Sequence, residues 1–250
     1  MAKPITGKTV VVTGGSRGIG LGLVKKFLAR NNLVIATSRK SSEATHLHEL
    51  HKQYPEHLIL TDLDTSTTSS ITAWAQHIKQ HKVANHVDLL VNNAGVYGRR
   101  LDLQNFEDED FLFAFRANTM GPFFVVQQLL KQELLGTTRE APDGKSLIAN
   151  MSSIVGSNAD PTVSAITKGG FPYRASKAAL NVISTTLARD LAPQGIEVVA
   201  LHPGYVQTDM TGGNGWISVE ESTTGLMTVL ESEGPLNGRF FSYNGTEIPW

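Results

Sequence analysis

The stretch Thr13-Gly14-Gly15-Ser16-Arg17-Gly18-Ile19-Gly20 decides the fold that the sequence predicts. It follows a strand-like run of valines and leads into the apolar helical pattern that starts at Leu21. Glycines permit a tight strand-to-helix turn with positive φ and let a ligand approach the backbone closely. The N–H groups and the dipole at the helix start would then favour a pyrophosphate. A tight connection without a ligand would use the same residues, so the place of the turn in the chain has to decide between the two.

Strand-length apolar runs alternate with segments of helical period along the chain, as in repeated βα units around a mostly parallel sheet. We expect strands near Thr9–Thr13, Leu33–Ser38, Leu58–Thr61, Asp88–Asn92, Ser146–Met151, Glu197–Leu201 and Arg239–Tyr243. We expect helices over Gly18–Arg30, Ser42–Gln53, Thr67–His81, Asp108–Leu135, Tyr173–Leu191 and Val219–Glu231. The glycine turn thus lies in the first βα connection, where open α/β sheets bind dinucleotides.

The pattern predicts one Rossmann-type α/β domain over residues 1–250, because no linker-like stretch divides the chain. Its doubly wound, mostly parallel sheet would have seven strands in the order 3-2-1-4-5-6-7, with helices on both faces.

Composition excludes several classes of protein. With 40% hydrophobic and 18% charged residues and a formal net charge of -1, the chain suggests neither a disordered tail nor a surface for nucleic acid. No apolar run resembles a signal peptide or a membrane span, so we expect a cytoplasmic protein without a membrane partner. The absence of cysteine removes disulfides and thiolate chemistry. The eight histidines lack the carboxylates that would complete a metal site, so no metal is expected.

The end of the second predicted strand bears on the choice of cofactor. A strand in this position normally ends in an acid that binds the ribose hydroxyls of NAD, but here it reads Ala36-Thr37-Ser38-Arg39-Lys40. Arg39, helped by Arg17, could clamp a 2′-phosphate with its fork of donors. NADP(H) is therefore favoured over NAD(H), the alternative being two ordinary solvated arginines.

Four motifs in order along the chain resemble those of the short-chain dehydrogenase/reductase family, and the resemblance covers essentially the whole sequence. They are Thr13–Gly20, which is similar to a TGxxxGxG cofactor turn, Asn92-Asn93-Ala94-Gly95, Tyr173-Arg174-Ala175-Ser176-Lys177, and the Pro203-Gly204 turn. Within the family, the chain is similar to C-factor-like and sniffer-like carbonyl reductases.

The resemblance adds further residues to the cofactor-binding set. Those outside the glycine turn, the end of the second strand and the Tyr173–Lys177 pair could equally be turn-forming residues. Asp62 would bind the adenine amino group with Leu63 beside it, and Val206 and Thr208 would reach the nicotinamide carboxamide. The full set is Gly14, Ser16, Arg17, Gly18, Ile19, Gly20, Ser38, Arg39, Asp62, Leu63, Asn93, Ala94, Gly95, Tyr173, Lys177, Pro203, Gly204, Val206 and Thr208.

Tyr173 and Lys177 are four residues apart and share one face of the predicted helix. A phenol with a pKa near about 10 exchanges protons poorly at neutral pH, and lowering that pKa to about 7 takes ~4 kcal/mol of phenolate stabilisation. A nearby ammonium in a desolvated pocket could supply it. Tyr173 would then be general acid in reduction and general base in oxidation.

Resemblance completes the predicted catalytic set with Ser153 and Asn118. Ser153 would stabilise the substrate oxygen at the end of a buried strand, whereas Ser152 would cap or pack. Asn118, in the long fourth helix, would hold a water that links Lys177 to solvent.

Two segments depart from the common pattern of the family. Ser153 and Tyr173 are 20 positions apart, so the intervening 157–170 is enlarged and would form a pocket wall or a dimer contact. Residues 209–218 are expected to be a substrate lid. A homodimer or homotetramer would form through the helices over Asp108–Leu135 and Tyr173–Leu191.

The sequence thus predicts an NADPH-dependent reductase that transfers hydride to a small-molecule aldehyde or ketone, with Tyr173 as general acid and base. Two alternatives stay open: an NAD-dependent alcohol dehydrogenase, and a C-factor-like signalling or dinucleotide-sensing protein.

Overall fold

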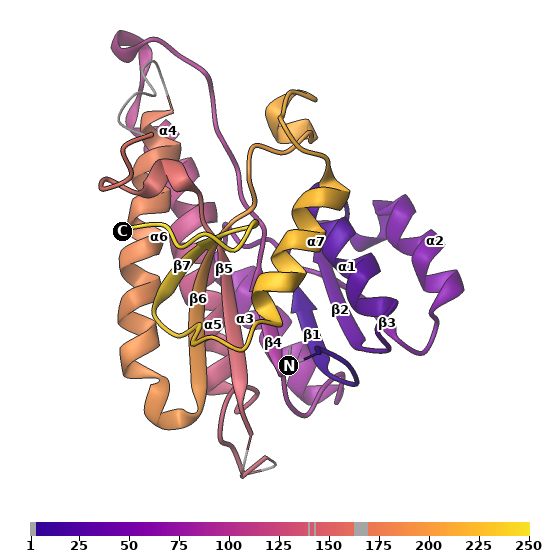
Figure 1. Ribbon diagram of the computed structural model, residues 1–250. Coiled ribbons are helices and arrows are strands. Elements are labelled where there is room, and N and C mark those ends of the chain that lie inside the picture. The colour runs from indigo at the N-terminus through magenta and orange to yellow at the C-terminus, as the bar shows by residue number, and fades with distance from the viewer. Residues whose placement is uncertain (1–3, 140, 143, 163–169) are drawn as a thin grey trace.

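Seven parallel strands form the centre of the molecule (Figure 1). The computed structural model describes residues 4–139, 141–142, 144–162 and 170–250. The strands are β1 (Thr9–Val12), β2 (Leu33–Ser38), β3 (Leu58–Asp62), β4 (Leu89–Asn92), β5 (Ser146–Met151), β6 (Ile196–His202) and β7 (Arg239–Ser242). Their order is β3-β2-β1-β4-β5-β6-β7 and every neighbouring pair is parallel, which confirms the predicted fold.

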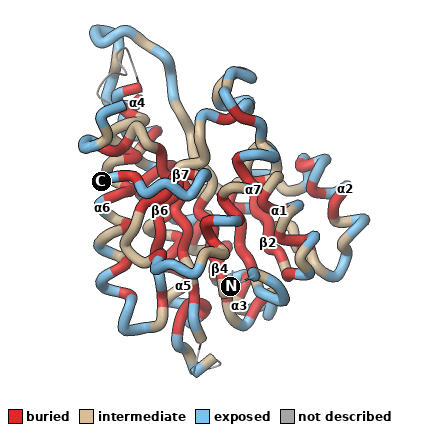
Figure 2. The backbone as a smooth tube through the Cα atoms, viewed as in Figure 1, coloured by how far each residue is buried: buried red, intermediate tan, exposed pale blue. Residues whose placement is uncertain are grey.

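Helices cover both faces of this sheet, and the buried residues lie where they meet it (Figure 2). Val10 and Val12 of β1 pack with the helices of one face, and Val11 packs with those of the other, because successive side chains of a strand point to opposite sides. The first face carries α1 (Gly18–Leu28), α2 (Thr45–Gln53) and α7 (Val219–Leu230), and the second carries α3 (Thr68–Gln80), α5 (Gly121–Lys131) and α6 (Phe171–Asp190).

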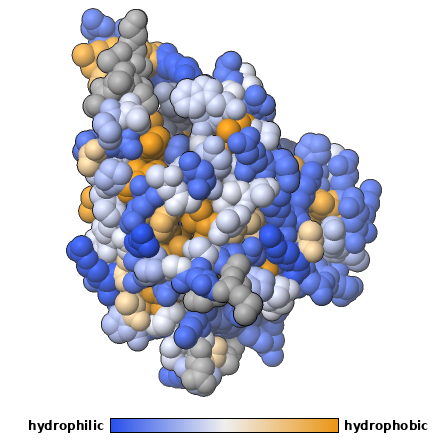
Figure 3. Space-filling view, viewed as in Figure 1, coloured by the Kyte–Doolittle hydropathy of each residue, from blue (hydrophilic) through white to orange (hydrophobic). Residues whose placement is uncertain are grey.

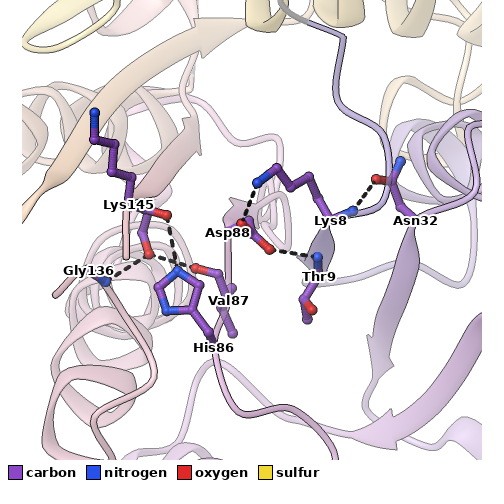
Figure 4. A network of polar contacts seen from close by, with 9 residues as sticks. Lys8, Thr9, Asn32, His86, Val87, Asp88, Gly136 and Lys145 are labelled. Carbon is purple, nitrogen blue, oxygen red and sulfur yellow. Dashed lines mark hydrogen bonds and ion pairs between the residues drawn. The ribbon is translucent and has the colours of Figure 1, made fainter. Parts of the chain in front are cut away.

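Polar side chains tie the strands together at their amino-terminal edge (Figure 4). Asp88, just before β4, accepts hydrogen bonds from the Thr9 amide at 2.9 Å and from Lys8 Nζ at 3.0 Å. Ser146 at the start of β5 donates to the Val87 carbonyl at 2.6 Å. These bonds fix the edge of the sheet that lies opposite the carboxyl ends, where ligands of α/β proteins bind.

The continuous helix expected over Asp108–Leu135 is wrong. The chain forms α4 (Asp108–Phe115), a π-helical turn over Arg116–Met120, and α5, which ends at Lys131. The side chain of Asn118 is held within the π turn by contacts to other segments, and Pro122 has no N–H to continue regular α-helical bonding. A tertiary contact has therefore overridden the local helical pattern.

Smaller differences concern the ends of elements. The helix expected from Ser42 starts as a 3-10 turn over Ser41–Glu43, and α2 proper begins at Thr45. Of the enlarged segment 157–170, residues 163–169 lie outside the described residues. Within the described part of the chain, no helix has the length and apolarity to cross a membrane.

Candidate active site

The glycine turn between β1 and α1 is shaped by close backbone approaches. Gly14 has φ +66°, and a Cβ there would lie 3.0 Å from the Ala94 Cα. A Cβ on Gly20 would lie 2.2 Å from the Gly14 carbonyl oxygen. Asn93 donates from Nδ2 to the carbonyls of Thr13 and Gly14, at 2.9 and 3.1 Å. The first two predicted motifs therefore meet, and only glycines fit between them.

The start of α1 fits a bound phosphate. Its N-cap residue, Arg17, makes no side-chain capping bond, so the first amides of the helix remain available. At the end of β2, Ser38 Oγ is buried and has no hydrogen-bond partner among the described residues. Arg39 beside it is exposed and forms no ion pair within the same residues. An orphaned hydroxyl next to a free guanidinium is the donor set that a dinucleotide phosphate requires.

Asp62 and Leu63 differ in what they offer a cofactor. Asp62, at the end of β3 beside Ser38, accepts a hydrogen bond from the Ser41 amide at 2.6 Å. Hydrogen bonds from the Ser41 side chain, and to a smaller extent from its amide, lower the pKa of the Asp62 carboxyl. Leu63 is 3% exposed and packs in the core against the second face of the sheet. Asp62 therefore lies where a ligand can reach it, whereas the side chain of Leu63 belongs mainly to the core.

Residues 209–218 meet the glycine turn. Arg17 Nη1 lies 3.2 Å from Asp209 Oδ2, and Thr208 lies within van der Waals reach of a Cβ built on Gly18. The segment begins with a 3-10 turn over Asp209–Thr211, and a bridge between Val206 and Ile217 closes it. Trp216 in this segment is 87% exposed.

The Pro203-Gly204 turn at the end of β6 is fixed from two sides. Ser222 of α7 donates to the Pro203 carbonyl at 2.6 Å. A Cβ on Gly204, which has φ +89°, would lie 2.5 Å from Ile217 Cδ1. The turn therefore places Val206, which is 3% exposed, and Thr208 at the carboxyl edge of the sheet.

Tyr173 and Lys177 lie in the first turns of α6, one helical turn apart. Lys177 is 4% exposed, and its Nζ donates to the Met151 carbonyl at the end of β5, at 2.7 Å. The same Nζ lies 5.8 Å from the centroid of the Tyr173 ring. Burial lowers the pKa of the Lys177 ammonium to about 8. The main chain of β5 thus holds the ammonium next to the phenol.

Burial raises the pKa of the Tyr173 phenol to about 12, while a hydrogen bond with the Ser153 side chain lowers it and the nearby Tyr97 raises it. This direction is opposite to the one expected from the sequence, because the loss of water around the phenol outweighs the groups that stabilise a phenolate. The residues of the chain therefore keep Tyr173 protonated at neutral pH.

Ser153 and Ser152 have separate roles at the end of β5. Ser153 is 7% exposed and caps a 3-10 turn over Ile154–Gly156 by accepting from the Val155 amide, which leaves its proton free to donate. Ser152 donates to Asn181 Oδ1 at 2.5 Å and so ties β5 to α6. Ser153 is therefore the serine that reaches Tyr173, whereas Ser152 packs between β5 and α6.

Asn118 is a tie between segments. Its Nδ2 donates to the Val96 carbonyl at 2.8 Å and to Ser176 Oγ at 3.0 Å, and its Oδ1 accepts from the Val96 amide at 2.8 Å. A Cβ on Gly95 would lie 3.0 Å from Asn118 Oδ1 and 3.7 Å from Lys177 Nζ. Both N–H donors of the amide are used in joining the third motif to the second, so the side chain has no donor left for a water.

Two residues of the site escaped the sequence analysis. Tyr97 packs against Tyr173 with ring centroids 4.9 Å apart, and the Arg100 guanidinium lies 4.5 Å from the centroid of the Tyr97 ring. Both belong to the irregular stretch before α4, where no periodicity indicates burial. Their only signal is position, directly after the Asn92–Gly95 motif.

The carboxyl-terminal residues contact the segment that follows Ser153. Ser157 Oγ donates to the Pro249 carbonyl at 2.5 Å, and the Ala159 amide donates to the Trp250 carbonyl at 3.3 Å. The Trp250 ring stacks on Phe240 of β7 with centroids 5.4 Å apart.

The family model for short chain dehydrogenases matches residues 8–215. The chain belongs to the short-chain dehydrogenase family. This short-chain dehydrogenase is 39% identical over 166 residues to the C-signal protein of Myxococcus xanthus. The match covers 66% of the chain and 93% of the C-signal protein. It is 30% identical to an uncharacterized oxidoreductase of Schizosaccharomyces pombe, over 98% of the chain and 99% of the relative.

Solved structures agree with the family assignment. An NADPH-bound carbonyl reductase from chicken fatty liver has a TM-score of 0.85 and 31% identity, and the match covers 98% of this short-chain dehydrogenase and 100% of that chain. The carbonyl reductase Sniffer of Drosophila melanogaster has a TM-score of 0.84 and 28% identity, with the same coverage. This short-chain dehydrogenase is an NAD(P)H-dependent oxidoreductase.

Proposed function

We propose that this oxidoreductase is an NADPH-dependent reductase of aldehydes or ketones, in which Tyr173 is the general acid. The observation that carries the proposal is the buried phenol of Tyr173, which is hydrogen-bonded to Ser153 and whose pKa burial raises to about 12. A protonated phenol is the form that reduction of a carbonyl uses, because the oxygen gains negative charge and then a proton. The similarity to carbonyl reductases supports the same direction.

Each residue of the set has a role that its contacts allow. The bound dinucleotide supplies the hydride. Ser153 and Tyr173 donate hydrogen bonds to the carbonyl oxygen of the substrate, where charge develops. Lys177, anchored on the Met151 carbonyl, favours the phenolate that Tyr173 becomes after it gives up its proton.

Asn118 supports proton return through its main chain rather than its amide. The side chain is occupied by Val96 and Ser176. In a regular α-helix the residue four positions on would donate to the Asn118 carbonyl, but that residue is Pro122, which has no N–H. We place the water that would link Lys177 to solvent at this carbonyl.

The preference for NADPH rests on Arg39, Arg17 and Ser38. Arg39 is free to meet a 2′-phosphate, and Ser38 Oγ offers a buried hydroxyl beside it. NADP-bound chains among the similar structures support this choice. Replacing Arg39 with aspartate reverses the charge, so Arg39→Asp should lose discrimination for the 2′-phosphate. Equal NADPH-to-NADH ratios of kcat/KM in both proteins would contradict the assignment.

The catalytic assignment is tested by steady-state reduction of a panel of aldehydes, ketones and quinones with NADPH. Tyr173→Phe should lose at least about a hundredfold in kcat, since general acid catalysis contributes factors of that order. Tyr54→Phe, which alters a half-buried tyrosine at the end of α2, is the matched control and should keep wild-type turnover. Wild-type turnover by Tyr173→Phe would refute the proposal.

The C-signal similarity favours a second candidate, a signalling or dinucleotide-sensing role. In that case cofactor binding matters and turnover does not. A double variant, Tyr173→Phe with Lys177→Ala, would then rescue a deletion phenotype as fully as the wild type. Failure to rescue would favour the reductase.

Assembly as a homodimer or homotetramer stays a prediction. Exposed apolar side chains on α4 and α6 support it, because they lie on the helices from which an interface was expected: Phe111, Leu112, Phe113, Phe171 and Val182. Light scattering after gel filtration would measure the mass, and a monomer at micromolar concentration would contradict the prediction.

A further inference from the structure

A cavity of about 430 Å³ opens beside the catalytic tyrosine. Its walls are formed by Tyr97, by residues 100–103, and by Gly170 and Phe171 at the start of α6. None of these residues belongs to the four motifs of the family. The chain that leads from β4 to α4 and the start of α6, which together line the cavity, come together in the upper corner near α4 in Figure 1. In Figure 3, apolar and hydrophilic surface lie side by side in this corner.

Tyr97 connects the cavity to the reacting centre. Its ring packs against Tyr173 at 4.9 Å between centroids, and it also lines the cavity. Gly170 makes room for it: a Cβ there would lie 2.9 Å from Tyr97 Oη, and the φ of +72° suits glycine. Tyr97 therefore contacts Tyr173 and also forms part of the cavity wall.

Arg100 is the cation of this cavity, and it is free to bind. Its guanidinium lies 4.5 Å from the centroid of the Tyr97 ring and has no ion pair within the described residues. The neighbouring Arg99 is different, because it is bound to Glu107 and Asp110 at 2.9 and 2.6 Å. A guanidinium held over an aromatic ring keeps its edge donors available, and their planar fork matches a carboxylate.

Apolar side chains also line the cavity, beside Arg100 and Asp102. Leu103 is 69% exposed and Phe171 is 44% exposed, although both are large hydrophobic residues. Exposed apolar side chains around one cation suit a ligand that has an apolar frame and a single anionic end. Asp102 also lines the cavity, and its negative charge weakens the attraction of the cavity for anions. Removing that charge should therefore have the opposite effect to removing the charge of Arg100.

We propose that this cavity is the outer part of the substrate site and that the enzyme prefers carbonyl compounds carrying a carboxylate. The carbonyl oxygen lies at Tyr173, the apolar frame passes Tyr97, and the carboxylate pairs with Arg100. The proposal rests on the reductase function proposed above.

Para-carboxybenzaldehyde and its methyl ester form a matched pair of probes, because they differ in the charge at the far end of the ring. The readout is the ratio of kcat/KM for the acid to that for the ester, with NADPH saturating. The wild type should favour the acid. Arg100→Gln should lower the ratio about tenfold, mainly through KM, because the contact is remote from the reacting atoms.

Two further variants bracket this result. Asp102→Asn removes the opposing charge and should raise the ratio. Arg139→Gln is the matched control, because it also removes one positive charge, but from a side chain that is 90% exposed on another loop. It should leave the acid-to-ester ratio of kcat/KM unchanged.

The outcomes separate the two proposals. Reduction of the ester without preference for the acid, or an unchanged ratio in Arg100→Gln, would overturn the carboxylate site and leave the reductase function standing. Failure of the wild type to reduce any carbonyl in the wider panel would overturn both.

Discussion

The hydrogen bonds that Asn118 makes to Val96 and Ser176 predict that replacing this residue destabilises the fold. A role in proton relay alone would predict no loss of stability. Asn118→Ala removes three hydrogen bonds, of 2.8, 2.8 and 3.0 Å, to Val96 and Ser176. Asn118 is fully buried, and each lost bond is worth about 1 kcal/mol net. The unfolding free energy should therefore fall by about 3 kcal/mol. For a chain of this size, that corresponds to a drop in Tm on the order of 10 °C.

Differential scanning calorimetry and urea unfolding, followed by the far-UV circular dichroism of the helices, would measure this change. Asn105→Ala is the control. Asn105 also lies between β4 and β5, but it is exposed, and its side chain makes no hydrogen bond within the described chain. It should change the unfolding free energy by less than about 0.5 kcal/mol. If Asn118→Ala is as stable as Asn105→Ala, the amide does not join the two motifs.

Three further changes follow from the site. Ser153→Ala removes a hydrogen bond that lowers the Tyr173 pKa, so the pH midpoint for alcohol oxidation should rise by about one unit; an unshifted pH–rate profile would contradict the contact. Gly20→Ala places a Cβ 2.2 Å from the Gly14 carbonyl oxygen, so NADPH binding followed by fluorescence titration should weaken at least about tenfold, and wild-type affinity would argue against the packing of the turn. Burial lowers the pKa of His202 from 6.5 to about 4. As the pH falls, the imidazole is therefore protonated in the unfolded chain before it is protonated in the folded protein. The unfolding free energy should fall by up to about 3 kcal/mol between pH 6.5 and about pH 4. In calorimetry His202→Gln should flatten that dependence, and an equally steep loss in the variant would assign it to other groups.

The framework of the fold is predictable because it depends on local pattern. Each strand is an apolar run, and the glycine turn has a sequence signature at the first βα connection. The Tyr173–Lys177 pair is equally local, since two residues four apart on a helix share a face whatever surrounds them.

Features that depend on distant contacts are not predictable in this way. The π turn around Asn118 is held by Val96 and Ser176, 22 and 58 positions away. The direction of the Tyr173 pKa depends on how completely the phenol is buried, and a motif carries no information on burial. Arg100 belongs to an irregular stretch, and only the structure distinguishes it from Arg99: Arg100 lies over Tyr97, whereas Arg99 pairs with acidic side chains.

The contact between the end of the chain and the segment after Ser153 has a practical consequence for handling the protein. The main-chain oxygens of Pro249 and Trp250 are acceptors for Ser157 and Ala159. Trimming these two residues, or fusing a bulky tag to them, disturbs a segment only a few positions from the serine that reaches Tyr173. An affinity tag therefore belongs before β1, which starts at the opposite edge of the sheet (Figure 1).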